Sequence, residues 1–75
     1  MKTKEISDLG LSAYLCVSDF KILSIKPIGR KSIFIFEESE GLEKAILSYF
    51  NHNAKVDPLS FFEQTRNLKA LSVQG

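Results

Sequence analysis

Two basic residues near the end of the chain, Arg66 and Lys69, have the type and the spacing to bind an anion. They lie three residues apart in a segment with helical periodicity, so their side chains project from neighbouring turns of one helix. Arginine presents a planar fork of donors that matches a carboxylate or a phosphate, and lysine adds a point charge. The pair therefore predicts an anion site on the last helix.

Arg66 also falls inside an apolar arc of that helix. At about 100° per residue, one stripe is formed by Leu59, Phe62, Ala70 and Val73. Arg66 lies in the middle of this stripe, while Phe61 and Leu68 lie on a roughly opposite one. A helix that is apolar on two sides is expected to be buried against more than one neighbour. We therefore expect Arg66 to be buried and, because a buried charge needs a partner, to contact an anion.

The anionic partner of Arg66 has three candidate sources. One is a small ligand in a pocket between subunits, where tyrosines would stack or hydrogen-bond and asparagines would read polar edges. The residues of this ligand site would be Arg66, Lys69, Tyr14, Tyr49, Asn51 and Asn67. The other two sources are a carboxylate of the same chain and a carboxylate of a second copy, for example the second copy's Glu43 or Glu63. The sequence leaves all three sources open.

A second group of bases precedes Ser32 without an intervening acid, and it consists of Lys21, Lys26, Arg30 and Lys31. Presented on a strand and a turn, these residues would contact phosphates and make the chain a small nucleic-acid-binding regulator. The competing interpretation, which we favour, is an edge strand that its lysines protect from aggregation. The net charge of +1 also argues against a strongly electrostatic nucleic-acid binder.

No combination of residues predicts catalysis or a bound metal. The chain has one cysteine, Cys16, and one histidine, His52, which together make neither a metal-ligand set nor a catalytic group. Cys16 is expected to pack within an apolar helix rather than to react, since a reactive thiol needs an exposed, electropositive setting. We therefore predict no enzyme activity, no cofactor and no metal.

The length of 75 residues predicts a single domain, residues 1–75, with a polar and disordered segment at 1–5. A chain this short buries only about 60% of the surface that its unfolded form exposes. A single cysteine excludes an intrachain disulfide, so we expect homo-oligomerisation, as a dimer or a larger assembly, to stabilise the fold. The sequence has no membrane span and no signal peptide pattern, and one free thiol suits a reducing compartment. A cytoplasmic protein without membrane contact is expected.

The elements that must position these residues predict a small α+β fold, in the order helix, β-hairpin, helix, helix. Ser7 or Asp8 is expected to cap the first helix, which ends at residues 18–19. A strand follows at residues 20–26, and the proline and glycine of residues 27–30 predict a turn.

The two strands of the hairpin differ in their patterns. In the first strand, Phe20 and Ile22 are expected on one face, with Leu23 and Ile25 on the other. The second strand, residues 33–36, is apolar on both faces, which predicts cover on both sides. A two-stranded hairpin is marginal in water and its edges accept further strands. We therefore expect the sheet to be completed by oligomerisation, through the hairpin edge and the last helix.

The middle helix has the clearest amphipathic pattern, formed by Leu42, Ala45, Ile46, Tyr49 and Phe50. Ser39 is expected to cap its start, and residues 51–53 to close it in a left-handed conformation. Asp57 is expected to cap the last helix, with Pro58 at its first position.

Four short segments together suggest a family. They are Ser7-Asp8-Leu9 leading into Ala13-Tyr14-Leu15, then Phe34-Ile35-Phe36-Glu37, Ala54-Lys55-Val56-Asp57-Pro58 and Arg66-Asn67-Leu68-Lys69. In these segments, and over about residues 6–72, the chain resembles a family of small proteins of unknown function encoded by bacteria and phages. It departs from the family pattern at Gly10, where the family carries a larger residue, and at His52, where the family often has a glycine that ends the middle helix. The resemblance implies small accessory proteins of phages, many of which act by binding.

These observations favour a non-enzymatic phage or bacterial accessory protein that self-associates and binds a small anionic ligand. In its sharpest form, this protein would sequester a nucleotide immune signal and so act against host defence. The alternatives are the nucleic-acid-binding regulator and a protein that inhibits a host factor by covering it.

Overall fold

The structure, a computed structural model, describes the backbone of residues 2–74 and the side chains of residues 2–71. Its elements run in the order β1 (Thr3–Ile6), α1 (Leu9–Val17), β2 (Ile22–Ile28), β3 (Lys31–Glu37), α2 (Glu40–Phe50) and α3 (Pro58–Gln74). The predicted α+β class is confirmed, as is the succession of helix, hairpin, helix and helix. Val73, which belongs to the predicted apolar stripe, has a side chain outside the described set.

The strand β1 corrects the expectation of disorder for residues 3–5, while residue 1, to which the same expectation applied, lies outside the described residues. It pairs antiparallel with β3, from Thr3 opposite Glu37 to Ile6 opposite Phe34. The strand is anchored by Ile6, which is buried, while its other residues are polar. One apolar residue in four gives no alternation that a sequence pattern can reveal. The sheet has the order β1-β3-β2, so its third strand comes from the chain itself, whereas the sequence suggested a second subunit.

The hairpin of β2 and β3 carries a bulge that changes which side chains face the core. β2 begins and ends two residues later than predicted, and the tight turn places Gly29 at φ 61°. A register shift after Ile22 lets Ile22 and Ile25 both pack against the core, while Leu23 is 48% exposed. The prediction that Ile22 and Ile25 lie on opposite faces is therefore wrong, because strict alternation holds only in a strand without a bulge.

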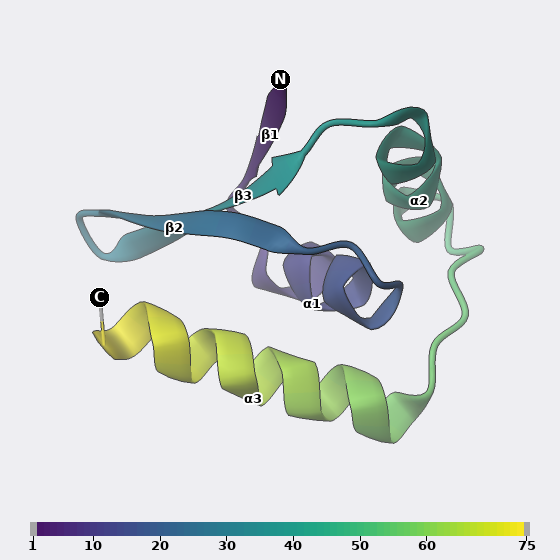
Figure 1. Cartoon of the computed structure of the whole chain (residues 1–75). Helices are drawn as coiled ribbons and strands as arrows, with labels where there is room; N and C mark the ends of the chain where they lie inside the picture. Colours follow the sequence, from purple (N-terminus) through teal and green to yellow (C-terminus); the bar gives the residue numbers. More distant parts are fainter. Residues whose placement is uncertain (1, 75) are drawn as a thin grey trace.

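The two faces of β3 are covered by different means. Phe34 and Phe36 are buried in the core, on the face of the sheet that the helices cover. Ile35 points to the opposite face and is also buried, although no helix lies over that face in Figure 1. There Lys26 of β2 reaches Glu5 of β1 across the intervening strand, with Nζ 3.8 Å from Oε2. The predicted cover on both sides is thus provided by helices on one face and by long side chains on the other.

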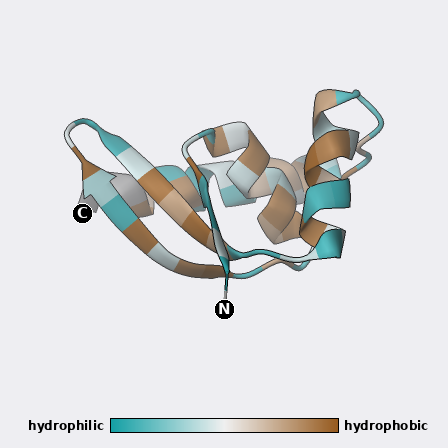
Figure 2. Cartoon of the chain, turned by 90° about the horizontal axis from the view of Figure 1, so that it is seen from above, coloured by the Kyte–Doolittle hydropathy of each residue, from teal (hydrophilic) through white to brown (hydrophobic). Residues whose placement is uncertain are grey.

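The sheet, α1 and α3 form three layers, with α1 in the middle, and α2 lies to one side of them (Figure 1). Seen from above, apolar and polar segments alternate along the hairpin (Figure 2). The buried core cluster is formed by Ile6, Leu11, Ala13, Tyr14, Leu15, Phe34, Phe36, Leu42 and Leu68. α1 supplies four of these residues because it is in contact on both sides, which is why it is apolar all round.

Three predicted caps are confirmed by side-chain hydrogen bonds. The backbone N–H groups of Leu11, Leu42 and Ser60 donate to Asp8 Oδ1, Ser39 Oγ and Asp57 Oδ2, at 3.0, 3.1 and 2.9 Å. Each bond satisfies a donor that the first turn of a helix leaves free, and a typical cap contributes about 1 kcal/mol. These caps fix where the helices begin and so align the side chains of the candidate site.

Candidate functional site

A pocket opens where the three helices meet the linker between α2 and α3. It has a volume of about 510 Å³ and is lined by Tyr14, Tyr49, Phe50, His52, Ala54, Val56 and Phe61. We call it the tyrosine pocket. Its walls are contributed by α1, α2, the linker and α3, so it forms only when these elements pack together. The volume and the aromatic lining are typical of sites for small molecules.

The aromatic rings of the pocket hold one another in place. The rings of Tyr14 and Tyr49 have centroids 5.6 Å apart and planes tilted by 34°. Tyr49 also meets Phe50 edge to face, at 5.6 Å and 83°. Both arrangements lie in the favoured range for aromatic pairs. The ring of Tyr49 is therefore a fixed wall, whereas Phe50, which is 58% exposed, presents its ring at the rim.

The hydroxyl of Tyr49 reaches the first turn of α1, where Gly10 makes room for it. A Cβ atom on Gly10 would lie 2.6 Å from the Tyr49 hydroxyl oxygen and 3.3 Å from Asp8 Oδ1. Burial raises the pKa of Tyr49, and the Asp8 carboxylate raises it further. The hydroxyl thus keeps its proton at neutral pH and remains a hydrogen-bond donor.

The end of α2 turns His52 and the linker into the pocket wall. The N–H of Asn53 donates to Ser48 O at 2.9 Å, and the N–H of His52 donates to Tyr49 O at 3.2 Å. These two bonds make a Schellman ending, in which His52 has the left-handed φ of 60°. The prediction that residues 51–53 close the helix in this conformation is confirmed. Glycine is the usual residue at such a position, so His52 occupies it at a conformational cost.

The structure brings together only part of the predicted ligand site. Tyr14 and Tyr49 line the same pocket, as the sequence analysis placed them in one site. Asn51 caps the end of α2 next to His52 without lining the pocket. The remaining three residues, Arg66, Asn67 and Lys69, are exposed on α3, and none of them lines the pocket.

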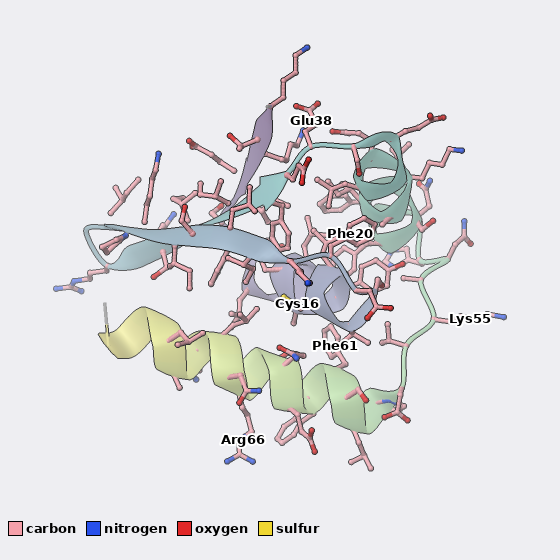
Figure 3. All side chains as sticks on the ribbon, viewed as in Figure 1. Cys16, Phe20, Glu38, Lys55, Phe61 and Arg66 are labelled. Atoms are coloured by element: carbon pink, nitrogen blue, oxygen red, sulfur yellow. The ribbon has the colours of Figure 1, made fainter. Side chains whose placement is uncertain are left out.

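The expectation that Arg66 is buried is wrong for the single chain. α3 packs on α1 through the stripe that contains Phe61 and Leu68, and Leu68 is only 2% exposed. In Figure 3, Phe61 points toward α1 while Arg66 points away from it. Its guanidinium carbon lies 5.9 Å from the ring centroid of Phe62, within the range of a cation–π contact. The helical period identified two stripes, but it could not tell which one faces the core.

The four hairpin bases do not gather into one ridge. Lys21 precedes β2, whereas Arg30 and Lys31 lie at its other end, and seven strand residues span about 23 Å. Lys26, between them, is engaged with Glu5. β2 is an edge strand that also contains Pro27, which cannot donate to a further strand. This arrangement favours the interpretation of the bases as edge protection over a nucleic-acid surface.

Five residues of the pocket were not predicted from the sequence, and they are Phe50, His52, Ala54, Val56 and Phe61. Phe50 and Phe61 were assigned to apolar faces, and His52 was expected only to end a helix. The signal that could have found them is the succession of apolar residues at alternate positions, 54 and 56, in a linker flanked by two helices with aromatic residues. Such a linker must pack on something.

The remaining predictions concern the single thiol, a metal site and a membrane span. Cys16 is half-buried and packs against the core, and burial raises the pKa of its thiol, so the predicted packing role is confirmed. Within the described residues, no three acidic, histidine or cysteine side chains are grouped to hold a metal ion. In the same part of the chain, no helix combines the length and the apolar character needed to cross a membrane.

Comparisons with known proteins give a match to a family model. The family model for a domain of unknown function, DUF5659, matches residues 1–74. No curated protein and no solved structure matches the chain. The match covers the segments on which the family resemblance was based.

Proposed function

This chain belongs to the DUF5659 family, and from that premise we propose that it is a non-enzymatic binding protein whose tyrosine pocket holds the planar ring of a small ligand. The observation that carries the proposal is the pocket itself, an open aromatic pocket of about 510 Å³ built from three helices and a linker. In its finer form, the ligand is a nucleotide, which the protein sequesters.

The chemistry of the pocket suits a ring with polar edges. Aromatic side chains stack on a nucleobase whichever base it is, and each such contact contributes about 1–3 kcal/mol. The structure records no hydrogen bond from the Tyr14 hydroxyl or the His52 ring to any other described residue, so both can bind the polar edge of a ligand.

In this proposal, the positive charge that binds the ligand's phosphate lies at the rim of the pocket. Lys55 lies between the lining residues Ala54 and Val56, is exposed, and points outward in Figure 3. A ligand whose ring enters the pocket would extend its phosphate outward, toward Lys55 and His52. In this proposal, Lys55 and His52 take the role that was predicted from the sequence for Arg66 and Lys69.

The test is calorimetric titration with nucleosides and with linear and cyclic nucleotides. The chain has two tyrosines and no tryptophan, and both tyrosines line the pocket, so tyrosine ring signals in NMR spectra report on this site alone. Binding that shifts both tyrosine signals is the expected result. The absence of binding across this panel, or binding that leaves the tyrosine signals unchanged, would overturn the proposal.

A matched pair of variants locates the ligand. Phe50→Ala removes a lining ring and is expected to weaken binding about tenfold or more, since a stacked ring is lost. Leu47→Ala is the control, because Leu47 lies on the same helix, is similarly exposed at 61% and does not line the pocket. Arg66→Ala should also bind as the unaltered chain does. Weaker binding by Arg66→Ala and unaltered binding by Phe50→Ala would return the site to α3.

A further inference from the structure

The outward side of α3 is an unpartnered face in the single chain. It is formed by Leu59, Phe62, Glu63, Arg66, Asn67 and Ala70, all of which are exposed, and we call it the outer stripe. Leu59 and Phe62 are 72% and 60% exposed, which is unusual for apolar residues on one helical stripe. Between the side chains of Glu63, Arg66, Asn67 and Ala70 lies a hollow of about 400 Å³.

The accessible surface of the chain is larger than expected for a compact monomer of its mass. A compact monomer of 8.5 kDa is expected to expose about 4,650 Å². The chain exposes 5458 Å², an excess of about 800 Å², which is close to the area that each partner buries in a standard interface. The surplus surface is therefore large enough to supply a specific interface.

The order of residues along the outer stripe is complementary to itself. If a second α3 lies antiparallel across a two-fold axis at the middle of the stripe, Glu63 lies opposite Arg66 of the partner subunit. Leu59 then lies opposite the partner's Ala70, whose small side chain leaves room for it. By symmetry each contact occurs twice, as an isologous interface requires. Neither Glu63 nor Arg66 takes part in an ion pair within the described residues, so both are available for this pairing.

We propose that the outer stripe of α3 binds a second copy of this chain, antiparallel about a two-fold axis, with two reciprocal Glu63–Arg66 ion pairs. The cation–π contact with Phe62 already holds the Arg66 guanidinium along the stripe. No residue of the stripe lines the tyrosine pocket, so the failure of one proposal leaves the other standing.

Charge reversal tests the pairing. Glu63→Arg gives a stripe with two positive charges, and Arg66→Glu gives one with two negative charges, so each variant faces its own copy with like charges only. We expect each to weaken dimerisation at least about 100-fold in sedimentation equilibrium. Equal amounts of the two variants, mixed, should form a heterodimer, and the double variant Glu63→Arg/Arg66→Glu should dimerise as the unaltered chain does.

Three outcomes would overturn the proposal. They are a monomeric wild-type chain at millimolar concentration, dimers that both single reversals leave intact, and a mixture of the two variants that stays monomeric. Lys31→Glu is the control, because it changes the net charge as Arg66→Glu does but lies at the hairpin turn. A dimer lost in Lys31→Glu and kept in Arg66→Glu would place the interface on the hairpin. Circular dichroism checks that each variant is folded, which is expected because the exchanged side chains are exposed.

Discussion

Phe61 and Phe62 are neighbours in the sequence but belong to the two surfaces that matter most in this domain. Phe61 points toward α1 and lines the tyrosine pocket, whereas Phe62 lies on the outer stripe and contacts Arg66. The pocket is aromatic and built from several elements, while the outer stripe combines apolar and charged residues and is carried by one helix. The contrast teaches that adjacent residues of one helix can belong to two different surfaces, the tyrosine pocket within the chain and the exposed stripe that we propose as an interface.

The largest expected difference between the two sides of α3 is in folding stability. Leu68 is 2% exposed and Leu59 is 72% exposed, so truncation of each to alanine probes the inner and the outer side of the same helix. Leu68→Ala should reduce the free energy of unfolding by about 3 kcal/mol, because it leaves a cavity in the core. Leu59→Ala should change it by less than about 0.5 kcal/mol in the dilute monomer.

Urea denaturation at low micromolar concentration measures both variants. A loss of more than about 1 kcal/mol in Leu59→Ala that persists on dilution would show that the outer side packs within the chain. If the loss in Leu59→Ala grows with protein concentration, it arises from the dimer, as the proposed interface requires.

The second prediction concerns the pocket alone and reverses a general rule. Gly→Ala within a helix usually stabilises a protein by up to about 1 kcal/mol. Here the new Cβ would lie 2.6 Å from the Tyr49 hydroxyl oxygen, and the Tyr49 ring is held between Tyr14 and Phe50. Gly10→Ala is therefore expected to destabilise the domain by about 1–2 kcal/mol, as overpacked cores do.

Tyr49→Phe supplies the control in a double-mutant cycle. With the hydroxyl removed, the same Gly10→Ala change should become neutral or stabilising, and thermal unfolding of the four proteins gives the coupling energy. Equal destabilisation by Gly10→Ala with and without the hydroxyl would show that the close approach to Tyr49 is not the cause.

The sequence predicted what depends on local chemistry. The caps Asp8, Ser39 and Asp57 and the left-handed helix end at residues 51–53 follow from interactions within a few residues of the chain. Choices that depend on partners distant in sequence were missed. β1 forms because it pairs with β3, and the bulge after Ile22 places Ile22 and Ile25 against the same core.

The same distinction explains the outcome for the candidate site. Tyr14 and Tyr49 were identified by their chemistry, and packing then brought their rings to within 5.6 Å. Arg66 was placed in an apolar stripe correctly, but helical periodicity carries no information on which stripe meets α1. That choice depends on which of two apolar surfaces complements the neighbouring helix, and only the assembled fold decides it.

The smallest expected effect comes from replacing the residue with positive φ at the end of each of two helices, which tests separately whether His52 affects stability and whether it binds the ligand. α1 and α2 end in the same way, with Asp19 at φ 72° and His52 at φ 60°, and of the two only His52 lines the tyrosine pocket. His52→Gly should raise the free energy of unfolding by about 1 kcal/mol, because glycine adopts the left-handed conformation without strain. Asp19→Gly should give a similar or smaller gain, since aspartate tolerates this conformation better than most residues.

Chemical denaturation measures both gains, and titration with the pocket ligand should show weaker binding by His52→Gly alone. A stabilised His52→Gly variant that binds as tightly as Asp19→Gly would mean that the imidazole contacts no part of the ligand, and the pocket would then recognise its ligand through the aromatic rings alone.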